Sequence, residues 1–189
     1  MTFLSHRSSF GFYLPFAKQQ AILLKDTSNT FIHPFFVHFS HMFGCHFYEE
    51  SRWDNSLTYL HSMHLQLCWE SLISMADHVD PFTLAQAWGF MGSATIFTHN
   101  ITRGKHYLRR CIELVKMNDI RFVPHLTGDE EDVTSAPRLD FTEEVHERAV
   151  FLAQLIYWLT YMNLLDGHSE EHCADLEHQF RFELPVRFA

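Results

Sequence analysis

PFFVHFSHMFGCHFY, residues 34–48, holds five phenylalanines, four of them at every fourth position. That spacing aligns the rings of Phe35, Phe39, Phe43 and Phe47 along one face of an α-helix. Proline at position 34 suits the first helical turn, where the missing amide hydrogen costs nothing. The expected cap is Asn29, Thr30 or His33. The stretch therefore predicts a helix with an apolar aromatic face.

Apolar residues recur every three or four positions on both sides of this stretch. Asp80 and Pro81 indicate a capped helix start, residues 100–104 a short turn, and Asp140 with Glu143 a capping box. No segment has a convincing strand pattern, so we predict an all-α, single-domain array of about six to eight helices. The expected helices are 16–25, 34–48, 56–76, 81–98, 101–117, from the capping box to Gly167, and 169–184.

The composition changes at residues 119–140, which lack helical periodicity. They contain Pro124, Gly128, Pro137 and the acidic run 129–132, and they predict a solvated loop. Residues 1–31 predict a loosely ordered N-terminal segment with at most one short helix. We therefore expect one helical domain over residues 32–185, with the acidic loop inside it.

Overall composition excludes several classes of protein. The 189 residues are 47% hydrophobic, which excludes a disordered chain. The charge of −9, from 14 basic and 23 acidic residues, opposes a duplex-binding module, which needs clustered Lys and Arg. Polar residues at 5–9 interrupt any secretory signal, and the longest apolar run, 151–165, is broken by Gln154 and Asn163. We therefore expect no membrane association.

The cysteines offer no standard metal-binding spacing. Cys45, Cys68, Cys111 and Cys173 include no C-x-x-C pair, which favours small buried side chains in a reducing compartment. His38, His41 and Cys45 do share one helix face and are all zinc-ligand types. The alternative for these three is a semi-polar seam that hydrogen-bonds to its neighbours.

A carboxylate–histidine set formally fits the ligands of a di-iron helical bundle. Three features count against it. His146 falls in the first turn of its helix, Asp175 stands where glutamate is expected, and Glu113 precedes Lys116 in the manner of a surface ion pair. We predict no catalytic, cofactor-binding or metal-binding residue, and keep a metal-dependent enzyme as the alternative. Its ligands would be Glu70, Glu113, Glu143, His146, Asp175 and His178.

Standard catalytic motifs are absent from the sequence. It contains no glycine-rich phosphate loop, no G-x-S-x-G and no S-x-x-K. Trp69, Trp88 and Trp158, together with the phenylalanine stripe, suit either a ligand cavity between helices or a packed core.

Five short stretches occur in a family-like order over residues 32–185. They are His33-Pro34 before a Phe-rich helix, Ala85-Gln86-Ala87-Trp88, Arg103-Gly104 followed by Tyr107 and Leu114, Glu147-Arg148-Ala149-Val150-Phe151 with Trp158, and Leu176-Glu177-His178-Gln179-Phe180-Arg181 before Leu184-Pro185. Together they resemble the regulatory middle homology region of fungal zinc-cluster transcription factors. The sequence departs from that pattern at residues 117–120, where the family usually has Gly-Leu-His, and it lacks the six-cysteine zinc cluster.

The resemblance implies a regulatory or interaction domain without enzymatic activity or cofactor, in the nucleus or alternatively the cytoplasm. It implies binding of a transcription protein or a small effector in a groove between helices. DNA contact would need an N-terminal zinc-cluster module that this sequence does not contain, which would make the chain a fragment of a longer regulator. The acidic charge agrees with this expectation.

Overall fold

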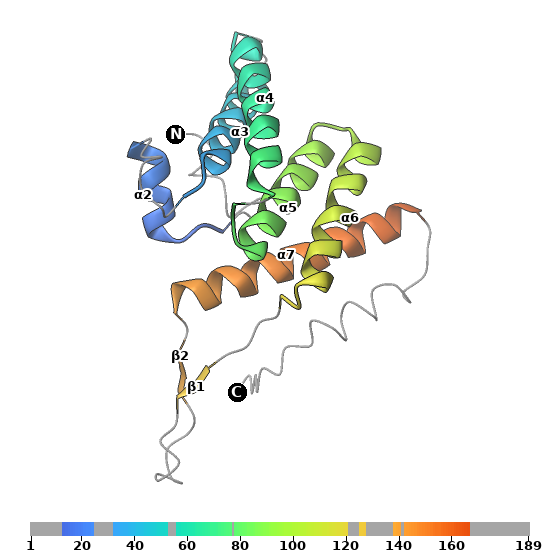
Figure 1. The fold of residues 1–189 in the computed structure, drawn as a ribbon. Helices are drawn as coiled ribbons and strands as arrows, with labels where there is room; N and C mark the ends of the chain where they lie inside the picture. Colours follow the sequence, from blue (N-terminus) through green and yellow to red (C-terminus); the bar gives the residue numbers. More distant parts are fainter. Residues whose placement is uncertain are drawn as a thin grey trace. The chain divides into compact units, whose positions relative to one another are not determined.

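The computed structural model describes residues 13–24, 32–52, 56–76, 78–120, 125–127, 138–140 and 142–166. The predicted all-α class is confirmed: the described residues form six helices and two three-residue strands (Figure 1). The elements are α2 (Phe16–Leu24), α3 (Pro34–Arg52), α4 (Thr58–Met75), α5 (Pro81–Phe97), α6 (Ile101–Met117), β1 (His125–Thr127), β2 (Arg138–Asp140) and α7 (Glu143–Asp166).

The chain forms two compact units, residues 1–120 and 121–189. The first contains α2 to α6, and the second contains β1, β2 and α7. The division falls at the start of the loop that the composition change marks. Among the described residues, no helix is both long and apolar enough to cross a membrane.

Helix α3 supplies the centre of the first unit. His33 caps it, since its Nδ1 accepts a hydrogen bond from the backbone N–H of Phe35 at 3.3 Å. The phenylalanine stripe is core, as its spacing indicates: Phe35 and Phe43 are 0% exposed, and Phe39 is 1% exposed. The Phe39 ring stacks on both of these neighbours, with centroids 5.8 and 5.5 Å away. Phe90 of α5 packs across the same face.

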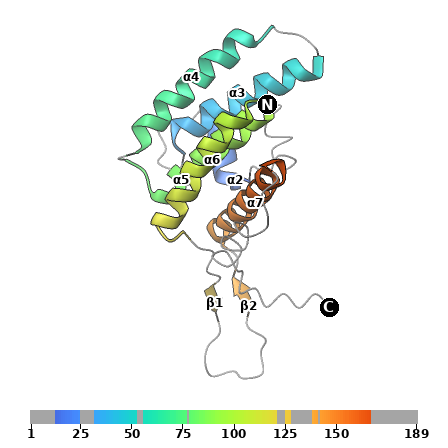
Figure 2. The ribbon, with the colours of Figure 1, turned by 90° about the vertical axis from the view of Figure 1, so that its right-hand side faces the viewer.

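Helix α4 lies alongside α3 in the opposite direction (Figure 2). Its bounds lie within two residues of the predicted 56–76. Three side chains spaced along one face, Cys68, Leu72 and Met75, are buried. The opposite face exposes Tyr59 and Ile73, so α4 is amphipathic, with one face in the core.

Helices α5 and α6 form a tight hairpin. Asp80 caps α5 as predicted, accepting from the N–H of Thr83 at 3.0 Å. The turn is shorter than the predicted 100–104, because α6 begins at Ile101 and Asn100 caps it through Oδ1, 3.2 Å from the N–H of Arg103. His99 adopts the left-handed conformation, with φ of 65°.

Gly104 therefore lies inside a helix rather than in the turn. A Cβ at this position would stand 2.8 Å from the carbonyl oxygen of Gly92 and 3.1 Å from the backbone N of Ile96. At Gly92, a Cβ would stand 2.6 Å from Leu108 Cγ. The two glycines let the backbones of α5 and α6 approach each other closely.

The second unit opens with an antiparallel pair of strands that the sequence does not predict. Leu126 of β1 is opposite Leu139 of β2. Three residues per strand are too few for alternation to be recognised, so the segment looks like loop. Asp140 ends β2 instead of capping α7, and the hydroxyl of Thr142 accepts from the N–H of Val145 at 3.3 Å. The predicted stop at Gly167 and the helix 169–184 lie outside the described residues.

Candidate functional site

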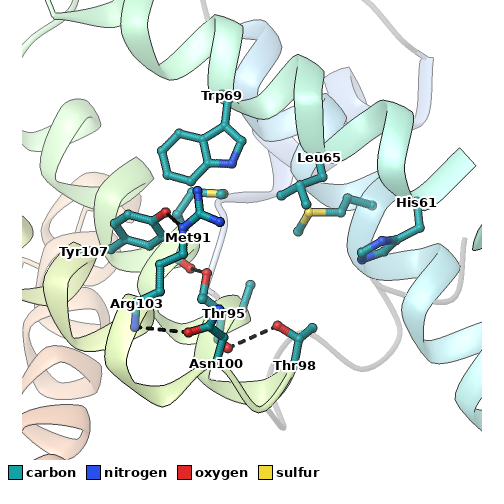
Figure 3. Close-up of a pocket in the computed structure, with 11 residues that line it drawn as sticks. His61, Leu65, Trp69, Met91, Thr95, Thr98, Asn100, Arg103 and Tyr107 are labelled. Atoms are coloured by element: carbon teal, nitrogen blue, oxygen red, sulfur yellow. Dashed lines mark hydrogen bonds between the residues drawn. The ribbon is translucent and has the colours of Figure 1, made fainter.

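A pocket of about 140 Å³ opens between α4, α5 and α6, and one residue of α3 also belongs to its lining (Figure 3). It combines apolar walls with a few polar groups, which is the usual composition of a small-molecule site. Its lining contains no aspartate or glutamate. The eleven lining residues are Met42, His61, Leu65, Trp69, Met91, Ala94, Thr95, Thr98, Asn100, Arg103 and Tyr107.

Helical spacing explains which residues reach the pocket. His61, Leu65 and Trp69 follow one another at four-residue intervals, so they share one face of α4. Arg103 and Tyr107 have the same spacing on α6. The hairpin turn brings the first turn of α6 to the face that α4 presents, because the glycine contact holds α5 and α6 together.

Arg103 is the only charged residue of the lining. Its guanidinium carbon lies 5.5 Å from the centroid of the Trp69 ring and 5.6 Å from that of Tyr107. These two rings are themselves 4.8 Å apart. The Nε–H of Arg103 donates to the Tyr107 hydroxyl. Cation–π contacts of this kind hold an exposed arginine in one orientation, each contributing about 0.5–1 kcal/mol.

The other polar groups of the pocket are neutral. The hydroxyl of Thr95 donates to the carbonyl of Met91 at 2.6 Å, and that of Thr98 to the carbonyl of Thr95 at 3.1 Å. Burial lowers the pKa of His61 below its usual value; His46 lowers it further, and Glu49 opposes the change. Imidazole with a lowered pKa is uncharged at neutral pH. The charge of the pocket at pH 7 is therefore that of Arg103.

The sequence leaves Trp69, Trp88 and Trp158 open between a ligand cavity and a packed core, and the structure separates them. Trp69 lines the pocket; Trp88 is not part of the lining, but its ring lies 5.8 Å from that of Tyr107. Trp158 belongs to α7 in the second unit, and the buried phenylalanines of α3 fill the core. His61, Arg103 and Tyr107 were not singled out as site residues. The spacing of Arg103 and Tyr107 is visible in the sequence, but their meeting with Trp69 is tertiary.

The histidine–cysteine set of α3 does not converge. His38 and His41 instead face His64 of α4, with ring centroids 5.6 and 4.8 Å away. Burial raises the pKa of the Cys45 thiol, and nearby Glu49 raises it further. Within the described residues, no group of three or more His, Cys, Asp or Glu side chains is arranged to hold a metal ion.

Two of the cysteines match the expectation of small buried side chains. Cys68 and Cys111 are fully buried free thiols. Burial raises both of their pKa values well above the usual range. Cys45 is only partly buried, and Cys173 lies outside the described residues.

Two members of the carboxylate–histidine set, Glu70 and Glu113, have partners on their own helices. Glu70 accepts from Gln66 at 2.8 Å, one turn away. Glu113 pairs with Arg110 at 3.0 Å, so the expected pairing with Lys116 is wrong. Glu143 and His146 are exposed in the first turn of α7. Asp175 and His178 lie outside the described residues.

The pocket is equipped for recognition, because its lining offers a fixed cation, two aromatic faces and an apolar floor. No protein-family model, curated protein or solved structure matches this chain.

Proposed function

We propose that this chain is a non-enzymatic regulatory domain of a fungal-type transcription regulator, and that it binds a small effector in the pocket between α4, α5 and α6. The observation that carries the proposal is Arg103, whose guanidinium lies against the rings of Trp69 and Tyr107 and is the only charge in a lining of apolar and neutral polar side chains. Such a combination supplies both a binding surface and one charge for orientation.

The source of the lining residues supports a regulatory role. They come from several helices and from the turn between α5 and α6. A ligand that contacts all of them stabilises the arrangement in which the helices are correctly packed. A partner protein that recognises this arrangement would then respond to the effector.

The resemblance to the fungal regulatory region supports the biological setting of the proposal. His33-Pro34 begins α3, and Ala85, Gln86 and Ala87 are buried within α5. The net charge of −9 disfavours direct contact with DNA by this chain. In this proposal, DNA contact comes only through a separate N-terminal module, and the protein acts in the nucleus or, alternatively, in the cytoplasm.

Two measurements test the proposal. The first is a thermal-melting screen of the purified chain against small anionic, neutral and cationic compounds. We expect one of these three classes of compound to raise the Tm in a saturable way, and we expect Trp69→Ala to abolish the rise. A rise in Tm that persists in Trp69→Ala would contradict binding in this pocket. The second maps the 5′ end of the transcript. Upstream codons for six closely spaced cysteines with Lys and Arg among them would support the transcription-factor setting, and a transcript without them would oppose it.

A further inference from the structure

The charge of Arg103 has no counter-charge in the part of the chain that the structure describes. Its contacts there are the two rings, the Tyr107 hydroxyl and the backbone cap at Asn100. Two other arginines of the described helices do form ion pairs: Arg110 pairs with Glu113 at 3.0 Å, and Arg148 with Glu144 at 2.9 Å. Arg103 is therefore a positioned cation without an ionic partner among the described residues.

The hydrogen-bond inventory of Arg103 indicates how such a partner would bind. A guanidinium has five N–H groups, and Nε–H is already used by Tyr107. The two terminal nitrogens carry the remaining four. Their planar arrangement matches the two oxygens of a carboxylate, which can accept a pair of parallel hydrogen bonds. The Trp69 and Tyr107 rings fix the plane of the group before a ligand arrives.

The rest of the lining limits the body of the ligand. Leu65, Met91 and Ala94 form an apolar wall, and the lining contains no second cation to balance a doubly charged phosphate. An apolar cavity of about 150 Å³ holds one benzene ring, so a pocket of about 140 Å³ has room for a single ring or a short branched chain. The pocket is therefore suited to a monoanion with a small apolar body.

Resting on the proposed function, we infer that the effector is a small monocarboxylate with one flat or branched apolar group, and that Arg103 pairs with its carboxylate. The apolar group lies against Trp69 and the wall of α5. Neutral His61 leaves the recognition of charge at pH 7 to Arg103 alone.

The test compares benzoate with benzamide, which has the same ring and similar shape but no charge. Binding of each to the full chain is measured by isothermal titration at pH 7.5 and low salt. We expect benzoate to bind about ten- to a hundredfold more tightly, the range for hydrogen bonds to a charged group. Arg103→Gln should abolish this preference. Arg103→Lys, which keeps the charge without the planar fork, should retain only part of it.

Arg109→Gln is the matched control, because Arg109 is an exposed arginine of the same helix that does not line the pocket. It should leave the preference for benzoate unchanged. If benzoate and benzamide bind with equal affinity, and Trp69→Ala weakens the binding of both, the carboxylate inference is wrong. The proposal that this pocket binds an effector would then still hold. Binding of neither compound would count against both, and a preference that survives Arg103→Gln would overturn the role of Arg103. Circular dichroism of each variant establishes that it is folded.

Discussion

Two aromatic clusters of the first unit differ in their environment: one is buried in the core, and the other lines a pocket. The rings of Phe35, Phe39 and Phe43 repeat along one face of α3 and are at most 1% exposed. The rings of Trp69 and Tyr107 come from different helices, α4 and α6, and meet across a pocket beside Arg103. The first cluster fills the core, and the second leaves a surface that a ligand can reach.

The difference follows from what completes each cluster. On α3, the Phe39 ring stacks on those of Phe35 and Phe43 and packs against Phe90 of α5, so the cluster is completed by other apolar rings. In the pocket, the two rings lie against the guanidinium of Arg103, a charged group that remains exposed. Aromatic residues repeated on one helix therefore indicate core, and aromatic residues gathered around an unmatched cation indicate recognition.

The largest expected effect on stability comes from removing a core ring. Phe39→Ala should lower the free energy of unfolding by about 3–5 kcal/mol, because it leaves a cavity among rings that cannot collapse fully. Phe16→Ala is the matched control, since Phe16 is 63% exposed, and it should have a far smaller effect. Urea unfolding followed by circular dichroism measures both. Similar losses in the two variants would contradict the assignment of α3 as the core helix.

The next effect tests the contact that brings α6 to the pocket. Gly104→Ala should destabilise by about 1–3 kcal/mol, because the added Cβ meets backbone atoms of Gly92 and Ile96 that cannot move aside cheaply. It should also weaken benzoate binding by shifting Arg103. Thr102→Ala, at an exposed position two residues earlier, is the control for both readouts. A Gly104→Ala variant as stable as the original chain would mean that the helices are not in close contact there.

Removing a pocket ring should weaken benzoate binding more than it lowers the stability of the fold. Trp69 is only partly buried, so Trp69→Leu should cost about 1 kcal/mol of stability, mainly the ring and cation–π contacts. Benzoate binding should fall roughly tenfold, since the guanidinium loses one of the rings that orient it. Tyr59→Leu, at an exposed position on α4, should change neither quantity. A loss of stability comparable to that of Phe39→Ala would mean that the pocket wall is core.

The smallest expected effect is a dependence of stability on pH. Burial lowers the pKa values of His33, His38 and His61 relative to the unfolded chain. Between the lowered value and about 6.5, the unfolded state binds more protons, so the free energy of unfolding rises with pH in that window. Glu70 near His38 and Glu49 near His61 oppose the shifts, and His46 reinforces that of His61.

Urea midpoints at pH 7.5 and 5.5 measure this effect. The urea midpoint should be lower at pH 5.5 than at pH 7.5. This decrease should be smaller in a variant that combines His33→Asn, His38→Asn and His61→Asn. Exposed His78→Asn is the control and should keep the full decrease. If the urea midpoint decreases as much in the triple variant as in the original chain, other groups cause the pH dependence.

Much of the fold could be predicted because its signals are local. The stripe of α3, the Asp80 cap and the extents of α4 to α6 all follow from spacing within a few residues. The strands β1 and β2 were missed because three residues carry no readable period. Gly104 was assigned to a turn because glycine signals a turn and close helix packing equally well.

The pocket could be predicted only in part. The sequence left Trp69 open between a cavity lining and a packed core, and its partner Arg103 lies on a helix that packs against α5. Spacing along the sequence cannot show whether a carboxylate lies beside an arginine in the folded chain. The charge of the site therefore emerges from the fold, while its aromatic character can be read from the sequence.

The most direct test of the effector pocket is a ¹H–¹⁵N spectrum of the chain titrated with benzoate, with the tryptophan indole and arginine Nε–H signals assigned. We expect saturable shifts of the Trp69 indole and the Arg103 Nε–H signals at one common affinity, with the Arg109 Nε–H signal unmoved. Shifts confined to other residues, or equal at Arg103 and Arg109, would contradict this expectation.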